Sequence, residues 1–143
     1  SAHQIKLQAD LEFSEADFSD ADVLFLPGGM PGTRNLAAHE GLCGELLKAD
    51  KAGKRLAAIC AGPSVLGGLG ILEGRKATCY PGFEGELKGA EYTRQGVVTD
   101  GNVTTARGLG YALDLGIELL ALLTDREHAG QIKDSIQYDQ IPM

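Results

Sequence analysis

Cys60 has the residue type and the position best suited to covalent chemistry. It follows the short apolar segment 56–59 and precedes Ala61-Gly62-Pro63, where the proline predicts the first turn of a helix. A sharp strand-to-helix turn raises a side chain as in a nucleophile elbow, and the N–H groups at a helix start stabilise a thiolate. A buried cysteine that acts as a small apolar side chain is an equally supported interpretation.

Gly28 and Gly29 follow a second apolar segment, residues 23–26, at the end of a predicted strand. This stretch has neither the GxGxxG spacing of a dinucleotide loop nor the pattern of a Walker phosphate loop. A tight turn that requires positive φ accounts for the two glycines, and on the residues alone we favour it. The alternative is an anion-stabilising loop whose N–H groups point to a centre beside Cys60.

Tyr80 and Arg107 are candidates for the rim of a site near Cys60. Tyr80 ends a predicted strand, and Arg107 lies between a strand and the longest predicted helix. An arginine there could bind a carboxylate or a sulfur oxyanion, and a structural salt bridge is at least as well supported. We expect Cys79 in the core and Cys43 within a helix, neither with a chemical role.

Histidine-dependent chemistry and metal binding receive no support from the sequence. His3, His39 and His128 lie in polar or amphipathic stretches and follow no strand, so we expect them at the surface. A Cys–His protease dyad and an amidotransferase triad are therefore not predicted. The cysteines and histidines share no ligand spacing, so we expect no metal and no cofactor.

Short apolar strands that alternate with helices must position these residues. The pattern predicts strands at residues 4–9, 23–26, 56–59 and 76–80 and a hairpin of strands 97–99 and 103–106. It predicts helices at residues 36–51, 63–69, 109–123 and 125–136. In the third of these helices, the i, i+3/i+4 spacing of Leu113, Ile117, Leu120 and Ala121 is typical of a helix. Such alternation indicates an α/β fold with a mostly parallel sheet, which binds ligands at the carboxyl ends of its strands.

Length and charge limit the class of protein. The chain has 143 residues, with 13 Lys plus Arg against 20 Asp plus Glu and a net charge of −7. These values suit a single domain over residues 1–143 and argue against nucleic acid as a partner. No apolar run is long enough for a membrane span. Three cysteines without CxxC spacing favour a reduced compartment, so we expect a cytoplasmic protein with no membrane partner.

Four motifs occur in an informative order. They are VLFLPGGMPG at 23–32, AAICAGP at 57–63, ATCYP at 77–81 and TTARGLG at 104–110. Together they resemble the ThiJ/PfpI superfamily, in particular the branch that contains Parkinson disease protein 7 and its bacterial relatives. The resemblance implies a flavodoxin-like, doubly wound sheet sandwiched by helices, and a homodimer. It also implies that Cys60 is an oxidation-sensitive cysteine in a small pocket. With the candidates from the strand ends, the expected pocket residues are Gly28, Gly29, Ala61, Tyr80 and Arg107. In that pocket the N–H groups of Gly29 and Ala61 would stabilise oxyanions.

Members of this branch are described as glutathione-independent glyoxalases, as deglycases and as redox-responsive chaperones. The resemblance therefore implies a Cys60-dependent enzyme that acts on methylglyoxal-like 2-oxoaldehydes or their adducts. The alternative is a stress-response protein or chaperone whose Cys60 is oxidised to sulfinic acid without turnover. Ala61 stands where protease-like members carry histidine, so we expect no peptidase activity. Tyr80 stands where some deglycase-type members carry histidine, so assistance from that histidine is not expected.

The resemblance further implies a strand, a helix and a second strand ahead of residues 4–9, with a glutamate that hydrogen-bonds the reactive sulfur. A βαβ unit needs roughly 30 or more residues. Only 22 residues precede Val23, and none of their carboxylates matches that glutamate. We therefore expect this chain to lack the strand–helix–strand unit, which a separate N-terminal segment of the same protein would supply.

Overall fold

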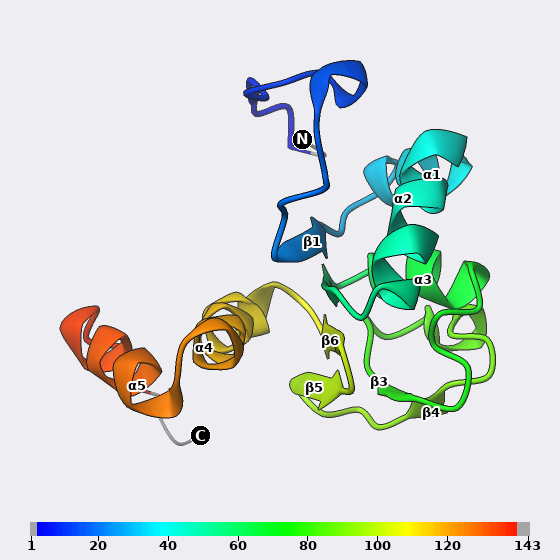
Figure 1. The fold of residues 1–143 in the computed structure, drawn as a ribbon. Coiled ribbons are helices and arrows are strands. Elements are labelled where there is room, and N and C mark those ends of the chain that lie inside the picture. Colours follow the sequence, from blue (N-terminus) through cyan, green and yellow to red (C-terminus); the bar gives the residue numbers. More distant parts are fainter. Residues whose placement is uncertain (1–2, 140–143) are drawn as a thin grey trace.

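Residues 3–139 are described by the computed structural model, and their strands form a four-stranded sheet with helices on both sides (Figure 1). The sheet has the order β1-β2-β6-β5, comprising β1 (Val23–Leu26), β2 (Arg55–Ile59), β6 (Val103–Ala106) and β5 (Val97–Asp100). The first three of these strands are parallel, and β5 pairs antiparallel with β6 as the predicted hairpin. A second, two-stranded sheet pairs β3 (Lys76–Ala77) with β4 (Glu91–Tyr92). The predicted mostly parallel α/β architecture is confirmed.

The helices divide into two groups. They are α1 (Gly32–Ala38), α2 (Glu40–Lys51), α3 (Pro63–Gly68), α4 (Ala112–Leu123) and α5 (Arg126–Ser135), with 3-10 turns η1 (Phe13–Glu15), η2 (Glu84–Glu86) and η3 (Leu109–Tyr111). Figure 1 shows α1, α2 and α3 on one side of the strands and α4 and α5 on the other. No helix within residues 3–139 is long and apolar enough to cross a bilayer.

Two predicted helices are interrupted. The helix expected at 36–51 is split at His39, whose backbone is extended and whose Nδ1 accepts a hydrogen bond from the Leu42 N–H at 3.0 Å. His39 thus caps α2, because the first N–H groups of a helix need acceptors outside it. The helix expected at 109–123 begins as the 3-10 turn η3 and becomes α-helical at Ala112.

The strand expected at residues 4–9 is wrong. These residues form irregular backbone, with Ile5 61% and Leu7 83% exposed. Alternating apolar residues stabilise a strand only when a neighbouring strand and a packed face receive them, and residues 4–9 have neither. The strand expected at 76–80 ends early, because the Thr78 N–H donates to the Thr105 hydroxyl at 2.9 Å instead of to a strand partner.

The core lies between the sheet and the helices α2 and α3. Its largest fully buried apolar side chains include Leu46, Leu56, Leu66 and Leu72. On the opposite side α4 is only partly covered: Leu113 is 52% exposed, and Leu115 is the one residue of α4 that is buried. The core therefore stabilises mainly the side of the sheet that faces α2 and α3.

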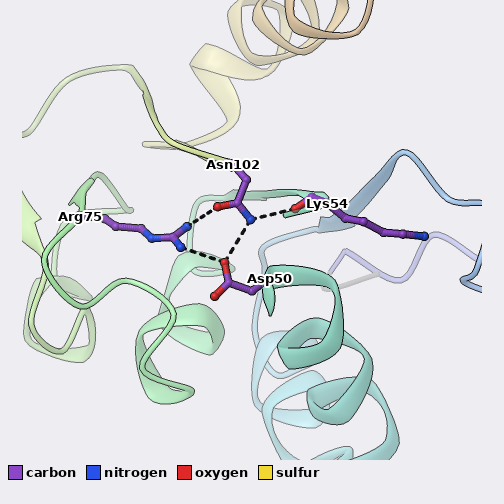
Figure 2. Close-up of polar contacts among 4 residues, drawn as sticks. All are labelled: Asp50, Lys54, Arg75 and Asn102. Atoms are coloured by element: carbon purple, nitrogen blue, oxygen red, sulfur yellow. Dashed lines mark hydrogen bonds and ion pairs between the residues drawn. The ribbon is translucent and has the colours of Figure 1, made fainter. Parts of the chain in front are cut away.

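A polar network joins the amino end of β2 to the β5–β6 turn (Figure 2). The Arg75 guanidinium donates to Asn102 Oδ1 at 2.8 Å and to Asp50 Oδ1 at 2.9 Å. The Asn102 amide donates to Asp50 Oδ1 at 3.0 Å and to the Lys54 carbonyl at 2.9 Å. These groups are only partly exposed to water. If one side chain were removed, the polar atoms that it binds would lose a hydrogen bond that water replaces only in part.

Candidate functional site

Cys60 lies at the carboxyl end of β2, in a strained left-handed turn. Its φ is +63°, a region that costs a non-glycine residue about 1–2 kcal/mol. The turn is held from both sides, because the Cys60 N–H donates to the Ala106 carbonyl at 2.9 Å and its carbonyl accepts from the Tyr80 N–H at 2.8 Å. The half-buried Cys60 therefore has the sharp strand-to-helix geometry that the sequence predicts.

Two glycines allow the chain to pack closely around this turn. A Cβ atom on Gly28 would lie 2.6 Å from the Cys60 Cβ and 2.8 Å from the Ile59 carbonyl oxygen. A Cβ atom on Gly62 would lie 2.8 Å from the Leu26 carbonyl oxygen. Both positions are therefore restricted to glycine by space, and they bring the end of β1 against the turn that carries Cys60.

Gly29 and Ala61 leave unused backbone donors next to Cys60. Gly29 has a φ of +90°, and its carbonyl accepts from the Thr33 N–H at 2.9 Å. Within residues 3–139, the N–H groups of Gly29 and Ala61 donate to no acceptor. Free N–H groups beside a nucleophile are the donors that stabilise an oxyanion in acyl-transfer enzymes.

An open, mostly apolar depression of about 590 Å³ lies in front of Cys60. Gly28, Gly29 and Cys60 line it, together with His3 at its edge. The rest of its lining is apolar and comes from β1, β2 and the η3–α4 region: Phe25, Ile59, Leu109, Ala112, Leu115, Gly116 and Leu119. Their apolar spacing in the sequence is typical of helix and strand core, and it gives no signal that they line a cavity at Cys60.

Tyr80 and Arg107 do not line this depression. The Tyr80 ring is half exposed and lies against Gly108, where an added Cβ would be 3.4 Å from a ring carbon. The Arg107 N–H donates to the Gly96 carbonyl at 2.8 Å, and the Arg107 charge acts to lower the pKa of Tyr92, opposing a larger rise caused by burial. The structure therefore brings Gly28, Gly29 and Cys60 together in one cavity, whereas Ala61, Tyr80 and Arg107 do not line it.

The other two cysteines have different surroundings. Cys79 is fully buried, and burial, with a smaller contribution from the charge of Glu84, raises the pKa of its thiol from 9.0 to about 11. The Cys43 thiol lies within α2 and donates to the Ala37 carbonyl at 3.4 Å. In the described part of the chain, no group of three or more histidine, cysteine or acidic side chains is arranged to hold a metal ion.

Comparison with known proteins gives a consistent relationship. The family model described as DJ-1/PfpI family matches residues 1–122. Protein DJ-1 homolog B of Arabidopsis thaliana is 37% identical over 134 residues, which are 92% of this chain and 31% of that protein. Protein dj-1beta of Drosophila melanogaster is 31% identical over 134 residues, 92% of this chain and 71% of its own length. A protein named as a deglycase from Pyrococcus horikoshii is 36% identical over 107 residues, 73% of this chain and 64% of that protein.

Solved structures agree. A cysteine-to-alanine mutant of a DJ-1 superfamily protein from Salmonella typhimurium superposes with a TM-score of 0.79 at 33% identity. An oxidized DJ-1 from Toxoplasma gondii superposes with a TM-score of 0.78 at 31% identity. Each match covers 83% of this chain and 65% of the solved chain. The chain thus spans about a third of the Arabidopsis relative and less than two thirds of these solved relatives. With the motifs, the sheet order and the Cys60 turn, these matches show that the chain belongs to the DJ-1/PfpI family.

Proposed function

We propose that the chain belongs to a Cys60-dependent enzyme for small aldehydes, of the glyoxalase or deglycase type. The observation that carries the proposal is the strained Cys60 turn, with the free N–H groups of Gly29 and Ala61 beside it. The relationship to archaeal proteins named as deglycases supports it. The proposed substrates are methylglyoxal-like 2-oxoaldehydes or their adducts.

The proposed reaction begins when the Cys60 thiolate adds to the aldehyde carbon. The resulting hemithioacetal oxygen faces the Gly29 and Ala61 N–H groups, which stabilise its negative charge. A proton then moves from the aldehyde carbon to the neighbouring carbon, and the product is a thioester of a 2-hydroxy acid. Water hydrolyses this thioester and regenerates the thiol, so the net reaction consumes one water and needs no oxidant.

The proton transfer needs a group that can accept and donate a proton, and in the described part of the chain no carboxylate of the Cys60 cavity is available for this role. Within residues 3–139, the cavity is lined by no aspartate or glutamate. The proposal therefore requires a carboxylate from another segment to move the proton between the two carbons. Without that group we expect addition of the aldehyde to Cys60 to proceed faster than release of the acid.

The test compares two cysteine variants in the presence of methylglyoxal. Cys60→Ser is expected to abolish both aldehyde consumption and 2-hydroxy acid formation, because serine lacks an accessible anion at neutral pH. Cys43→Ser is the matched control, because Cys43 is also half-buried but lies in α2 away from the cavity. Aldehyde turnover that is equal in the wild-type and Cys60→Ser proteins would exclude the proposal.

A redox sensor is the second candidate function. The same N–H groups of Gly29 and Ala61 would stabilise a sulfinate, and one solved relative is described as oxidized. Two molecules of peroxide would each transfer one oxygen to the Cys60 sulfur and leave as water. Mass spectrometry after mild peroxide treatment separates the candidates: selective gain of two oxygens at Cys60 without aldehyde turnover favours the sensor.

Homodimerisation and a cytoplasmic location are also proposals at this point. The family relationship supports a homodimer, and sedimentation of the purified chain at several concentrations tests it. A chaperone activity is a third proposal, which predicts that Cys60→Ala protein protects an aggregating client as well as wild-type protein does.

A further inference from the structure

Gly29 is held in place by hydrogen bonds to its carbonyl group. It has no side chain, and no atom lies within 4 Å of the position that a Cβ atom would take there. Its φ is +90°, and within residues 3–139 its N–H donates to no acceptor. Glycine has the greatest backbone freedom of any residue. An N–H group that is to stabilise an oxyanion must already point to it, so the N–H of Gly29 needs a restraint from elsewhere.

Thr33 supplies this restraint. Its N–H and its hydroxyl both donate to the Gly29 carbonyl, each at 2.9 Å. Thr33 lies in the first turn of α1 and is only 2% exposed, so water competes little for either hydrogen bond. One buried side chain therefore ties down the glycine that carries the first free donor.

Ser64 makes the same arrangement at Ala61, which carries the second free donor. The Ser64 N–H donates to the Ala61 carbonyl at 3.0 Å, and the Ser64 hydroxyl donates to it at 2.7 Å. Ser64 lies in the first turn of α3 and is 8% exposed. The two residues that have a free N–H beside Cys60 are thus held in the same way, each by the N–H and the hydroxyl of one buried residue.

This pairing differs from the other hydrogen bonds of its kind. Serine and threonine often donate to a carbonyl three or four residues earlier, with a local effect on the helix. In the part of the chain that the structure describes, two further hydroxyls do so. Thr124 donates to the Leu120 carbonyl and Ser135 to the Ile132 carbonyl, each at 2.8 Å. Both lie exposed at the carboxyl ends of α4 and α5, whereas the two buried hydroxyls both bind the donor residues.

We propose that the Thr33 and Ser64 hydroxyls are positioning groups, which fix the Gly29 and Ala61 N–H groups in the direction of the anion that forms at Cys60. The inference rests on the proposed function, in which these N–H groups stabilise an oxyanion. Figure 1 shows α1 and α3 on the same side of the strands. Thr33 and Ser64 line one cavity of about 300 Å³ there, and neither lines the depression in front of Cys60. The hydroxyls therefore act through the donor residues and not on the substrate.

The first experiment measures the addition of methylglyoxal to Cys60, as the gain in mass at this residue over time. Thr33→Val and Ser64→Ala each remove one hydroxyl with little change in volume. We expect each to slow the addition by about tenfold, because a misaligned N–H stabilises the developing negative charge less well. Thr33→Ser and Ser64→Thr keep the hydroxyl and are expected to react within about twofold of the wild-type rate. The cavity beside Ser64 has room for the added methyl group.

The matched controls are Thr124→Val and Ser135→Ala. They remove hydrogen bonds of the same two types, from a hydroxyl to the carbonyl four or three residues earlier. Neither residue lines the depression in front of Cys60, so we expect both variants to react at the wild-type rate. A control variant that slows the addition as much as Thr33→Val or Ser64→Ala would overturn the inference.

The second experiment needs no aldehyde. Backbone ¹⁵N relaxation gives the order parameter of each N–H group, which is about 0.85 for a rigid backbone and below about 0.6 for a flexible one. We expect the Gly29 value to fall into the flexible range in Thr33→Val, and the Ala61 value to do so in Ser64→Ala. Thr33→Ser and Ser64→Thr are expected to keep the wild-type values.

Two further results would overturn the inference. One is that both N–H groups remain rigid in Thr33→Val and Ser64→Ala, and the other is that the variants which keep the hydroxyl react as slowly as those which lose it. Failure of the proposed function has a different signature, namely aldehyde turnover that is equal in the wild-type and Cys60→Ser proteins. The order parameters still decide whether Thr33 and Ser64 hold the two N–H groups in that case.

Discussion

Gly28 and Cys60 are in direct contact across the ends of β1 and β2, where a Cβ atom on Gly28 would lie 2.6 Å from the Cys60 Cβ. The contact packs the loop after β1 against the Cys60 turn after β2. The same Cβ would lie 3.2 Å from the Ala61 nitrogen. The position of Cys60 is thus coupled to the first strand of the sheet.

Gly28→Ala is expected to displace this contact. Forcing an atom into a packed site costs about 1–3 kcal/mol of stability, and we expect at least tenfold slower reaction of Cys60 with a thiol reagent. Gly32→Ala is the control, because no atom lies within 4 Å of a Cβ there. Urea unfolding and thiol kinetics measure the two effects. Equal behaviour of the two variants would contradict the contact.

The left-handed turn at Cys60 predicts an unusual order of stability. Cys60→Gly is expected to be more stable than Cys60→Ala by roughly 1 kcal/mol, because glycine adopts a φ of +63° without the clash of a Cβ. At most exposed helix or strand positions the order is reversed. Urea midpoints of the two variants, with matched slopes, decide the point, and a more stable alanine variant would show that the turn is unstrained.

Because the Cys79 thiol is buried, we expect the free energy of unfolding to decrease at high pH. Burial raises the pKa of its thiol from 9.0 to about 11 in the folded chain. Below about pH 9 the thiol is protonated in both states and contributes no pH dependence. Above that pH the unfolded chain releases the proton first, so unfolding becomes easier as the pH rises toward 11, by at most about 2–3 kcal/mol.

The comparison for this effect is Cys79→Ala. The free energy of unfolding is measured between pH 8 and pH 11 for both proteins, and the difference between them isolates the thiol. We expect the wild-type curve to fall more steeply. Parallel curves would mean that the Cys79 thiolate is tolerated in the folded chain.

Substitution of Asn102 is expected to lower the stability of the fold without changing the reactivity of Cys60. Asn102→Ala removes the hydrogen bonds to Arg75, Asp50 and the Lys54 carbonyl, and we expect a loss of about 1–3 kcal/mol because partly buried polar groups lose their partners. Lys48→Ala, which breaks an exposed ion pair with Glu45, is expected to cost less than about 1 kcal/mol. Cys60 modification rates should remain unchanged in both. A reactivity change in Asn102→Ala would indicate coupling along β2.

The local sequence was sufficient to predict the two strand ends at which Gly28, Gly29 and Cys60 lie. Short apolar runs followed by Pro27-Gly28-Gly29 and Cys60-Ala61-Gly62 identified two parallel strands and a sharp turn, because glycine and proline report directly on backbone conformation. The helix break at His39 could not be seen in the apolar spacing, since it depends on a side chain that accepts a backbone hydrogen bond.

Burial depended on neighbours that the sequence does not specify. Residues 4–9 alternate as a strand does but remain exposed, because no other strand lies beside them. Leu113 has the spacing of a buried face and is 52% exposed, because α4 is packed on fewer sides than its composition suggests. The apolar lining of the Cys60 cavity was missed for the same reason: periodicity identifies an apolar face but not the surface that it meets.

The polar network of Asp50, Arg75 and Asn102 lies at the amino end of β2, and Cys60 follows the carboxyl end of the same strand. Five residues of extended chain, on the order of 16 Å, separate the two. Residues that stabilise the fold at one end of β2 and residues around Cys60 at the other end can therefore be varied separately. In a directed-evolution experiment, the loops around Cys60 can be randomised in a background whose stability has been raised at the opposite end of the sheet.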